Sequence, residues 1–150
     1  MRRQLTIEII SSLLILLFVY TALSKLLDFN LFRHTLGQSP IIGNNAAFVA
    51  IALPIVELVV AALLFFPRTR LAGLYGSFGL MTAFTLYIGY ILTLADKVPC
   101  SCGGVIKELG WRDHLIFNIF FVMASLAGLL LERRRRRRTD DPGLPPVVFT

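Results

Sequence analysis

The sequence predicts an all-α integral membrane protein that folds as a four-transmembrane-helix bundle. Hydrophobic residues make up 56% of its 150 residues and charged residues only 16%, whereas soluble domains contain about 45–50% apolar residues. The apolar residues form four long blocks, and each block is long enough for the roughly 20-residue helix that crosses a hydrocarbon layer. Because lipid offers no hydrogen-bond partners to the backbone, these blocks must be helical.

The four predicted transmembrane helices occupy approximately residues 7–27, 46–66, 71–94 and 114–131. They define one membrane domain, residues 1–132. Residues 133–150 begin with six consecutive arginines and continue with a proline-containing stretch, so we predict a basic anchor and then a disordered cytoplasmic tail. Since the arginine run directly follows an apolar span, contact with anionic lipid headgroups explains it better than nucleic-acid binding.

The basic residues also predict the orientation, because Lys and Arg near span ends are retained in the cytoplasm. Ten of the 15 basic residues fall on one side of a four-span chain. These ten are Arg2, Arg3, Arg68, Arg70 and the run from Arg133 to Arg138. We therefore expect a multi-pass protein of the bacterial inner membrane with both termini in the cytoplasm. Two loops, residues 28–45 and 95–113, would then face the periplasm.

The second outward loop contains both cysteines of the chain, in the sequence Cys100-Ser101-Cys102. Thiols that can reach each other in an oxidising compartment tend to form disulfides, so we expect a Cys100–Cys102 bridge. An extended chain holds positions i and i+2 near the upper Cα separation of about 6.8 Å for disulfides, and a strained ring is easily reduced. Pro99 and Gly103 favour the sharp bend that closing the ring requires.

Three uses of this pair remain open: redox exchange, a structural staple and soft-metal binding. A staple across one intervening residue removes little entropy from the unfolded chain and therefore stabilises weakly. Two thiolates can bind copper(I) or zinc, but a closed metal site needs more ligands than the few histidines and methionines of this chain supply. Both arguments favour redox exchange, and we predict no metal site.

Several motifs lie along the chain in a fixed order. They are Ser24-Lys25-Leu26-Leu27-Asp28, Ser39-Pro40, Pro54 with Glu57, and Pro99-Cys100-Ser101-Cys102-Gly103-Gly104, continued by Trp111, His114 and Asn118. This order resembles the MauE family of methylamine-utilisation membrane proteins, which is related to the DoxX group, over residues 15–130. The resemblance implies a four-helix inner-membrane protein linked to periplasmic disulfide chemistry. It also implies a role like that of the family's original member, which is needed for maturing methylamine dehydrogenase.

Four polar residues are candidate supporting groups for the cysteines. Glu57 is expected near mid-membrane, where a carboxyl group must be protonated or hydrogen-bonded inside the bundle. Three roles are open for Glu57: a structural hydrogen bond, proton handling, or contact with a quinone. Lys25, one turn from the outer end of its span, either snorkels to the interface or lies under the cysteine loop and favours a thiolate. His114 and Asn118 share a helix face near that loop, and the histidine either exchanges protons or caps the helix.

These residues predict a thiol–disulfide oxidoreductase that exchanges with a periplasmic thioredoxin-like partner. With only two cysteines the chain cannot relay a dithiol between internal pairs, so its second redox partner must be external or quinone-like. Trp111, Tyr87 and Tyr90 are expected in the interfacial aromatic belt, and a quinone between them is the one cofactor that the sequence suggests. The main alternative is a non-enzymatic assembly or scaffold subunit whose cysteines are incidental or bind a soft metal. A small-solute transporter fits less well, because four spans without inverted repeats are atypical of transporters.

Overall fold

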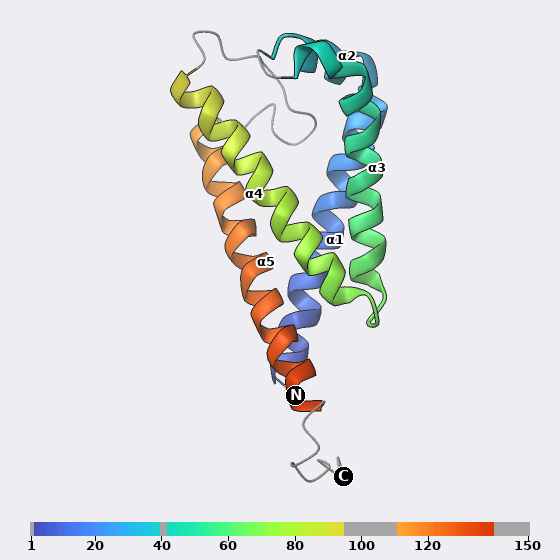
Figure 1. Ribbon diagram of the computed structural model, residues 1–150, viewed down its shortest axis with the longest axis vertical. Helices are drawn as coiled ribbons and strands as arrows, with labels where there is room; N and C mark the ends of the chain where they lie inside the picture. Colours follow the sequence, from blue (N-terminus) through green and yellow to red (C-terminus); the bar gives the residue numbers. More distant parts are fainter. Residues whose placement is uncertain (1, 40–41, 95–110, 140–150) are drawn as a thin grey trace.

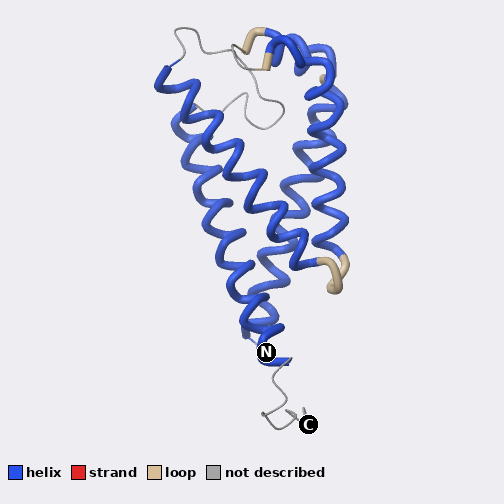
Figure 2. Tube along the Cα trace, in the orientation of Figure 1, coloured by secondary structure: helices blue, strands red, loops and turns tan. Residues whose placement is uncertain are grey.

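The computed structural model describes residues 2–39, 42–94 and 111–139, and nearly all of these residues are helical (Figures 1 and 2). The elements are α1 (Arg2–Leu27), α2 (Phe29–Gly37), the 3-10 helix η1 (Gly43–Asn45), α3 (Ala46–Phe65), α4 (Arg70–Leu94) and α5 (Trp111–Thr139). Four of the helices, α1, α3, α4 and α5, are long and apolar enough to cross a membrane. The predicted all-α fold with four transmembrane helices is confirmed.

The four long helices form a closed ring in which each contacts two neighbours. Helix α1 packs along α3, α3 against α4, α4 along α5, and α5 against α1. The first residues of α1, the turn between α3 and α4, and the last residues of α5 lie at one end of the bundle, which we call the arginine end (Figure 1). Helix α2 lies across the opposite end, which we call the α2 end.

The side chains inside the ring form an apolar core, and large apolar side chains also cover its outside. Leu14, Phe18 and Leu64 are among the core residues and are at most 1% exposed. Outside, Phe48 is 74% exposed and Leu86 is 69% exposed. Soluble proteins rarely expose apolar surface this extensively, whereas in a bilayer such side chains contact lipid.

Glycines in α4 allow close contact with α3. The sequence predicts such contact along Gly73, Gly76 and Gly79, with Ala72 and Gly76 four residues apart on one face. A Cβ on Gly73 would lie 2.7 Å from a backbone nitrogen of α3, and one on Gly76 would lie 3.0 Å from a valine methyl group of the same helix. A Cβ on Gly79 would meet no other described helix within 4 Å, and Ala72 is exposed. The prediction is therefore confirmed for Gly73 and Gly76 but wrong for Gly79 and Ala72. At about 100° per residue, Gly79 is turned about 120° around the helix from Gly73, and Ala72 is turned about 100° from it.

The predicted outer loop, residues 28–45, contains a helix. The turn-forming residues of this segment suggested a loop, but α2 and η1 occupy most of it. Phe29, Phe32 and Leu36 repeat at helical spacing, and the last two are buried against the start of α3, beside Ala46. Burial of this apolar stripe stabilises α2 on the bundle. As a result, α2 places aromatic side chains over one end of the transmembrane helices.

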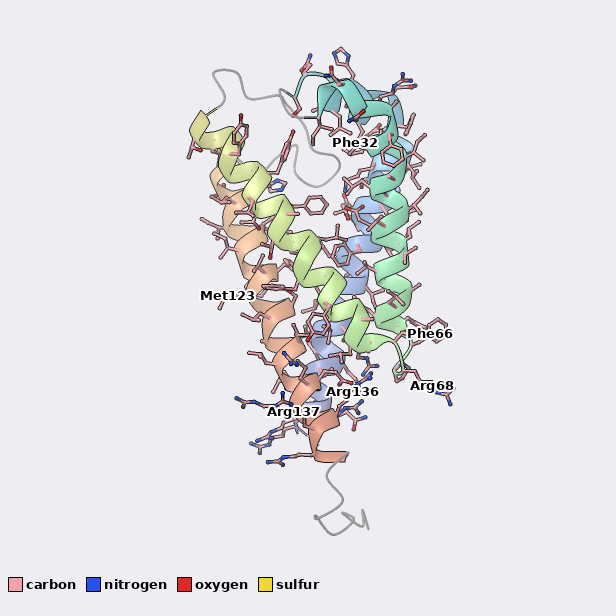
Figure 3. All side chains as sticks on the ribbon, viewed as in Figure 1. Phe32, Phe66, Arg68, Met123, Arg136 and Arg137 are labelled. Atoms are coloured by element: carbon pink, nitrogen blue, oxygen red, sulfur yellow. The ribbon has the colours of Figure 1, made fainter. Side chains whose placement is uncertain are left out.

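Helix α5 extends further than the sequence predicts, through the arginine run to Thr139. Glu132 is fully buried and accepts hydrogen bonds from Arg135 and Arg136, each at 3.1 Å. Arg136 also donates to the carbonyl oxygens of Pro67 and Arg68, and Figure 3 shows Arg68 and Arg136 at the arginine end. These bonds tie the end of α5 to the α3–α4 turn. The predicted disordered tail, residues 140–150, lies outside the described residues.

Candidate functional site

A buried ion pair joins α1 to α3 in the half of the bundle near α2. The Lys25 Nζ donates a hydrogen bond to the Glu57 Oε1 at 2.7 Å. The Lys25 side chain is 11% exposed and the Glu57 side chain 1% exposed. A charge within a membrane protein is costly unless it is paired, and each of these two residues supplies the other's partner.

Aromatic rings surround the Lys25 ammonium group. Its Nζ lies 5.9 Å from the ring centroid of Phe32 in α2 and 5.7 Å from that of Phe84 in α4. Both distances fall in the range of cation–π contacts, which strengthen when the cation is removed from water. Lys25 therefore contacts three other helices, and the helix at the end of the bundle takes part in holding its charge.

A cavity of about 260 Å³ lies beside this ion pair. Its walls are mainly apolar and include Leu17, Phe18, Leu53, Phe84 and Phe117. Its polar groups come from four helices, and they are Thr21, Lys25, Glu57, Tyr87, His114 and Asn118. The cavity is thus an apolar chamber in the membrane with polar groups gathered around the ion pair.

Two polar atoms at the cavity have no hydrogen-bond partner within the described part of the chain. They are the second carboxylate oxygen of Glu57, Oε2, and the amide nitrogen of Asn118, Nδ2. Both residues are buried, at 0% and 4% exposed. The hydroxyl of Thr21 donates to the Phe18 carbonyl oxygen of its own helix, at 3.2 Å. Buried polar groups are normally satisfied, so an acceptor and a donor are both left available to a ligand or to water.

Two further polar residues line the cavity at the α2 end. The Tyr87 hydroxyl donates to the Ser39 Oγ at 3.0 Å and so links α4 to the segment after α2. His114, 7% exposed, belongs to the first turns of α5. Tyr87 lines the cavity, and Tyr90 is 37% exposed. Their expected place in the interfacial belt remains a prediction. The side chain of Trp111 lies outside the described residues.

The structure brings together the four residues that the sequence singled out as supporting groups. Lys25, Glu57, His114 and Asn118 come from α1, α3 and α5 and line the same cavity. Glu57 is buried and hydrogen-bonded, as a mid-membrane carboxylate must be. Lys25 does not snorkel, because its ammonium group turns inward to Glu57. The chemical roles predicted for these residues remain predictions.

Sequence reasoning missed the aromatic part of the site and the link between its charges. Phe32 and Phe84 were not singled out, although the helical spacing of Phe29, Phe32 and Leu36 could have revealed the buried side of α2. Lys25 and Glu57 lie on different helices, so no local spacing could pair them. Among the described residues, no cluster of three or more His, Cys, Asp or Glu could hold a metal ion.

The two cysteines lie outside the described residues, so their predicted bridge remains a prediction. The segment that carries them, residues 95–110, leaves α4 after Leu94 and enters α5 at Trp111. Both of these helix ends lie at the α2 end of the bundle (Figure 1). The cavity is lined from the same half of both helices, by Tyr87 of α4 and His114 of α5.

Comparison with known proteins gives one family. A family model described as "Methylamine utilisation protein MauE" matches residues 3–131. The match includes all four long helices up to the last core turns of α5, together with the cavity and the cysteine segment. Neither curated proteins nor solved structures give a match.

Proposed function

Since the chain belongs to the MauE family of methylamine-utilisation membrane proteins, we propose that it is a thiol–disulfide redox protein of the bacterial inner membrane. In this proposal Cys100 and Cys102 exchange with a thioredoxin-like partner in the periplasm and so serve the maturation of periplasmic proteins. The observation that carries it is the Cys100-Ser101-Cys102 sequence, whose spacing suits a reducible bridge better than a staple. These are the only cysteines of the chain.

The distribution of charge supports a periplasmic location for this pair. Arg68, Arg136 and Arg137 lie at the arginine end (Figure 3), and the first residues of α1 add Arg2 and Arg3 there. By the positive-inside rule, this end belongs in the cytoplasm. The α2 end, from which the cysteine segment leaves α4, then belongs in the periplasm.

The exchange itself requires only the two sulfur atoms and a partner. When the partner is oxidised, one thiolate of the pair attacks its disulfide, forms a mixed disulfide and releases a partner thiolate. The second cysteine then attacks the mixed disulfide, which closes the Cys100–Cys102 bridge and releases the partner as a dithiol. The reverse sequence oxidises the partner. Two electrons move between the proteins in either direction, and no atom other than hydrogen is exchanged.

A trapping experiment tests this proposal. With Cys102→Ser the second step cannot occur, so the mixed disulfide through Cys100 should accumulate and run as a reducible adduct on a non-reducing gel. Cys100→Ser tests the opposite order of attack. Ser101→Ala is the matched control, because it alters the residue between the sulfurs but keeps both of them, and it should trap nothing.

Two results would contradict the redox role. The first is that neither single variant captures a partner while the Cys100→Ser/Cys102→Ser protein keeps full activity in maturation. The second comes from alkylation in intact cells: a pair that stays oxidised when respiration changes indicates a permanent bridge. Either result would favour the assembly subunit that the sequence also allows.

A further inference from the structure

We propose that the cavity beside the Lys25–Glu57 pair binds the ring of a quinone, which serves as the electron partner of the cysteine pair. The binding site is argued from the cavity alone. The redox step rests on the proposed function, because it requires the thiols of Cys100 and Cys102 to exchange electrons.

The size and walls of the cavity fit one flat ring. An apolar cavity of about 150 Å³ holds a benzene molecule, and this cavity measures about 260 Å³. The room suffices for a substituted ring but not for a long isoprenoid tail, which would have to extend into lipid. Phe18, Phe84 and Phe117 are among the wall residues, and aromatic walls favour stacking with a planar ligand.

The unpartnered polar atoms identify the ligand class more closely. A quinone carries carbonyl oxygens that accept hydrogen bonds, and the Asn118 Nδ2 is a buried donor without a partner within residues 2–39, 42–94 and 111–139. The Lys25 Nζ has three donor hydrogens. One makes the short bond to Glu57 at 2.7 Å and a second makes a long bond to the Thr21 carbonyl oxygen at 3.5 Å, which leaves one for a ligand. The site therefore offers hydrogen bonds to a carbonyl group.

The same site also suits the reduced form of the ligand. A hydroquinone carries hydroxyl groups that donate hydrogen bonds, and the Glu57 Oε2 is a buried acceptor that no described residue satisfies. A saturated lipid chain would use neither the donor nor the acceptor. A ligand that alternates between carbonyl and hydroxyl groups uses both.

The electron balance closes with one quinone for each pair of thiols. As the Cys100–Cys102 bridge forms, the two thiols lose two electrons and two protons. The quinone gains two electrons and two protons and becomes the hydroquinone. In the opposite direction the hydroquinone reduces the bridge, with the same count. This partner supplies what a chain with one cysteine pair lacks, namely a second place for the electrons.

Binding of decylubiquinone to the full-length protein in lipid nanodiscs tests the site. Isothermal titration calorimetry measures the binding. The chain has a single tryptophan, and quenching of its fluorescence provides a second readout if the quinone binds within range of that side chain. We expect saturable binding that decylbenzene, which has the same tail but no carbonyl groups, does not displace. The Cys100→Ser/Cys102→Ser protein should bind equally, because none of the groups from which the site is argued belongs to this pair.

Two variants test the residues of the site. Asn118→Leu removes the unpartnered amide at nearly constant volume, and we expect binding at least about 10-fold weaker, corresponding to a lost hydrogen bond of about 1.4 kcal/mol. Leu53→Phe reduces the cavity from its apolar wall and should weaken binding without removing a polar group. Ser11→Ala is the matched control, since the Ser11 Oγ is also buried without a partner among the described residues, but Ser11 does not line the cavity. The affinity of this variant for the quinone should stay within about 2-fold of the wild type.

The proposal is wrong if the wild-type protein shows no saturable binding, if decylbenzene competes equally, or if Asn118→Leu and Leu53→Phe both bind like the wild type. A cavity filled only with water would give the first result. These outcomes are separate from the trapping experiment. A trapped mixed disulfide without quinone binding would leave the proposed function in place and move the second electron partner outside the bundle.

Discussion

The Lys25–Glu57 pair predicts a strong energetic coupling between α1 and α3. At 2.7 Å, two unit charges attract by about 6 kcal/mol for an effective dielectric constant of about 20. Removing both charges from water offsets most of this attraction. The pair therefore contributes little compared with two apolar residues, but either charge left alone is costly. We expect Lys25→Met or Glu57→Leu alone to lower the free energy of unfolding by about 3–5 kcal/mol.

The double variant Lys25→Met/Glu57→Leu should recover most of this loss and unfold within about 1 kcal/mol of the wild type. Titration with sodium dodecyl sulfate in mixed micelles, followed by circular dichroism, measures the free energy of unfolding of all four proteins. The wild type, the two single variants and the double variant form a double-mutant cycle, which yields the coupling energy between Lys25 and Glu57. Additive effects, or single losses below about 1 kcal/mol, would refute the reasoning, because they would mean that the two charges do not depend on each other.

Two further predictions concern packing and the arginine end, and the same titration measures both. Gly73→Ala should lower the free energy of unfolding by about 1–3 kcal/mol, because the new Cβ would lie 2.7 Å from the α3 backbone. Gly79→Ala is the control: its new Cβ would meet no other described helix within 4 Å, so the change should be neutral or stabilising by up to about 1 kcal/mol. Arg136→Ala should cost about 1 kcal/mol, since it removes the bond to Glu132 and those to the α3–α4 turn. Arg137→Ala, which alters an exposed neighbour, should have no measurable effect; equal losses within either matched pair would contradict the assigned contacts.

The sequence predicts the four spans well because one physical requirement dominates them. A helix that crosses lipid needs about 20 apolar residues, and this requirement leaves long blocks that are visible without any tertiary information. The predicted second span, residues 46–66, differs from α3 by one residue at its end. The ends of the first and last spans are less accurate. Helices α1 and α5 continue past the predicted apolar spans into segments that contain arginines. In α5, Glu132 pairs with Arg135 and Arg136 of the following turn.

Helix α2 and the pairing of charges were beyond this kind of prediction for a different reason. In α2 the apolar stripe competes with nearby turn formers, and its contact with the start of α3 decides the outcome. Lys25 and Glu57 are 32 residues apart in sequence, so their proximity follows from the packing of α1 against α3. The cost of a charge in the membrane predicts that each of these residues is paired inside the bundle. Which residue serves as the partner can be known only from the folded structure.

The buried polar residues fall into two groups, and the difference bears on which of them serve a ligand. Ser77 and Ser125 donate to carbonyl oxygens of their own helices, at 2.8 Å in each case, so their burial needs no other helix. At the cavity, the Lys25 ammonium has its short bond across helices, and one atom each of Glu57 and Asn118 has no bond within the described chain. Folding alone would be served by apolar residues at these three positions, since a buried pair is seldom more stable than its apolar replacement. A stability effect near zero for the double variant, combined with loss of quinone binding in the same protein, would therefore show that these polar groups act on a ligand and not on the fold.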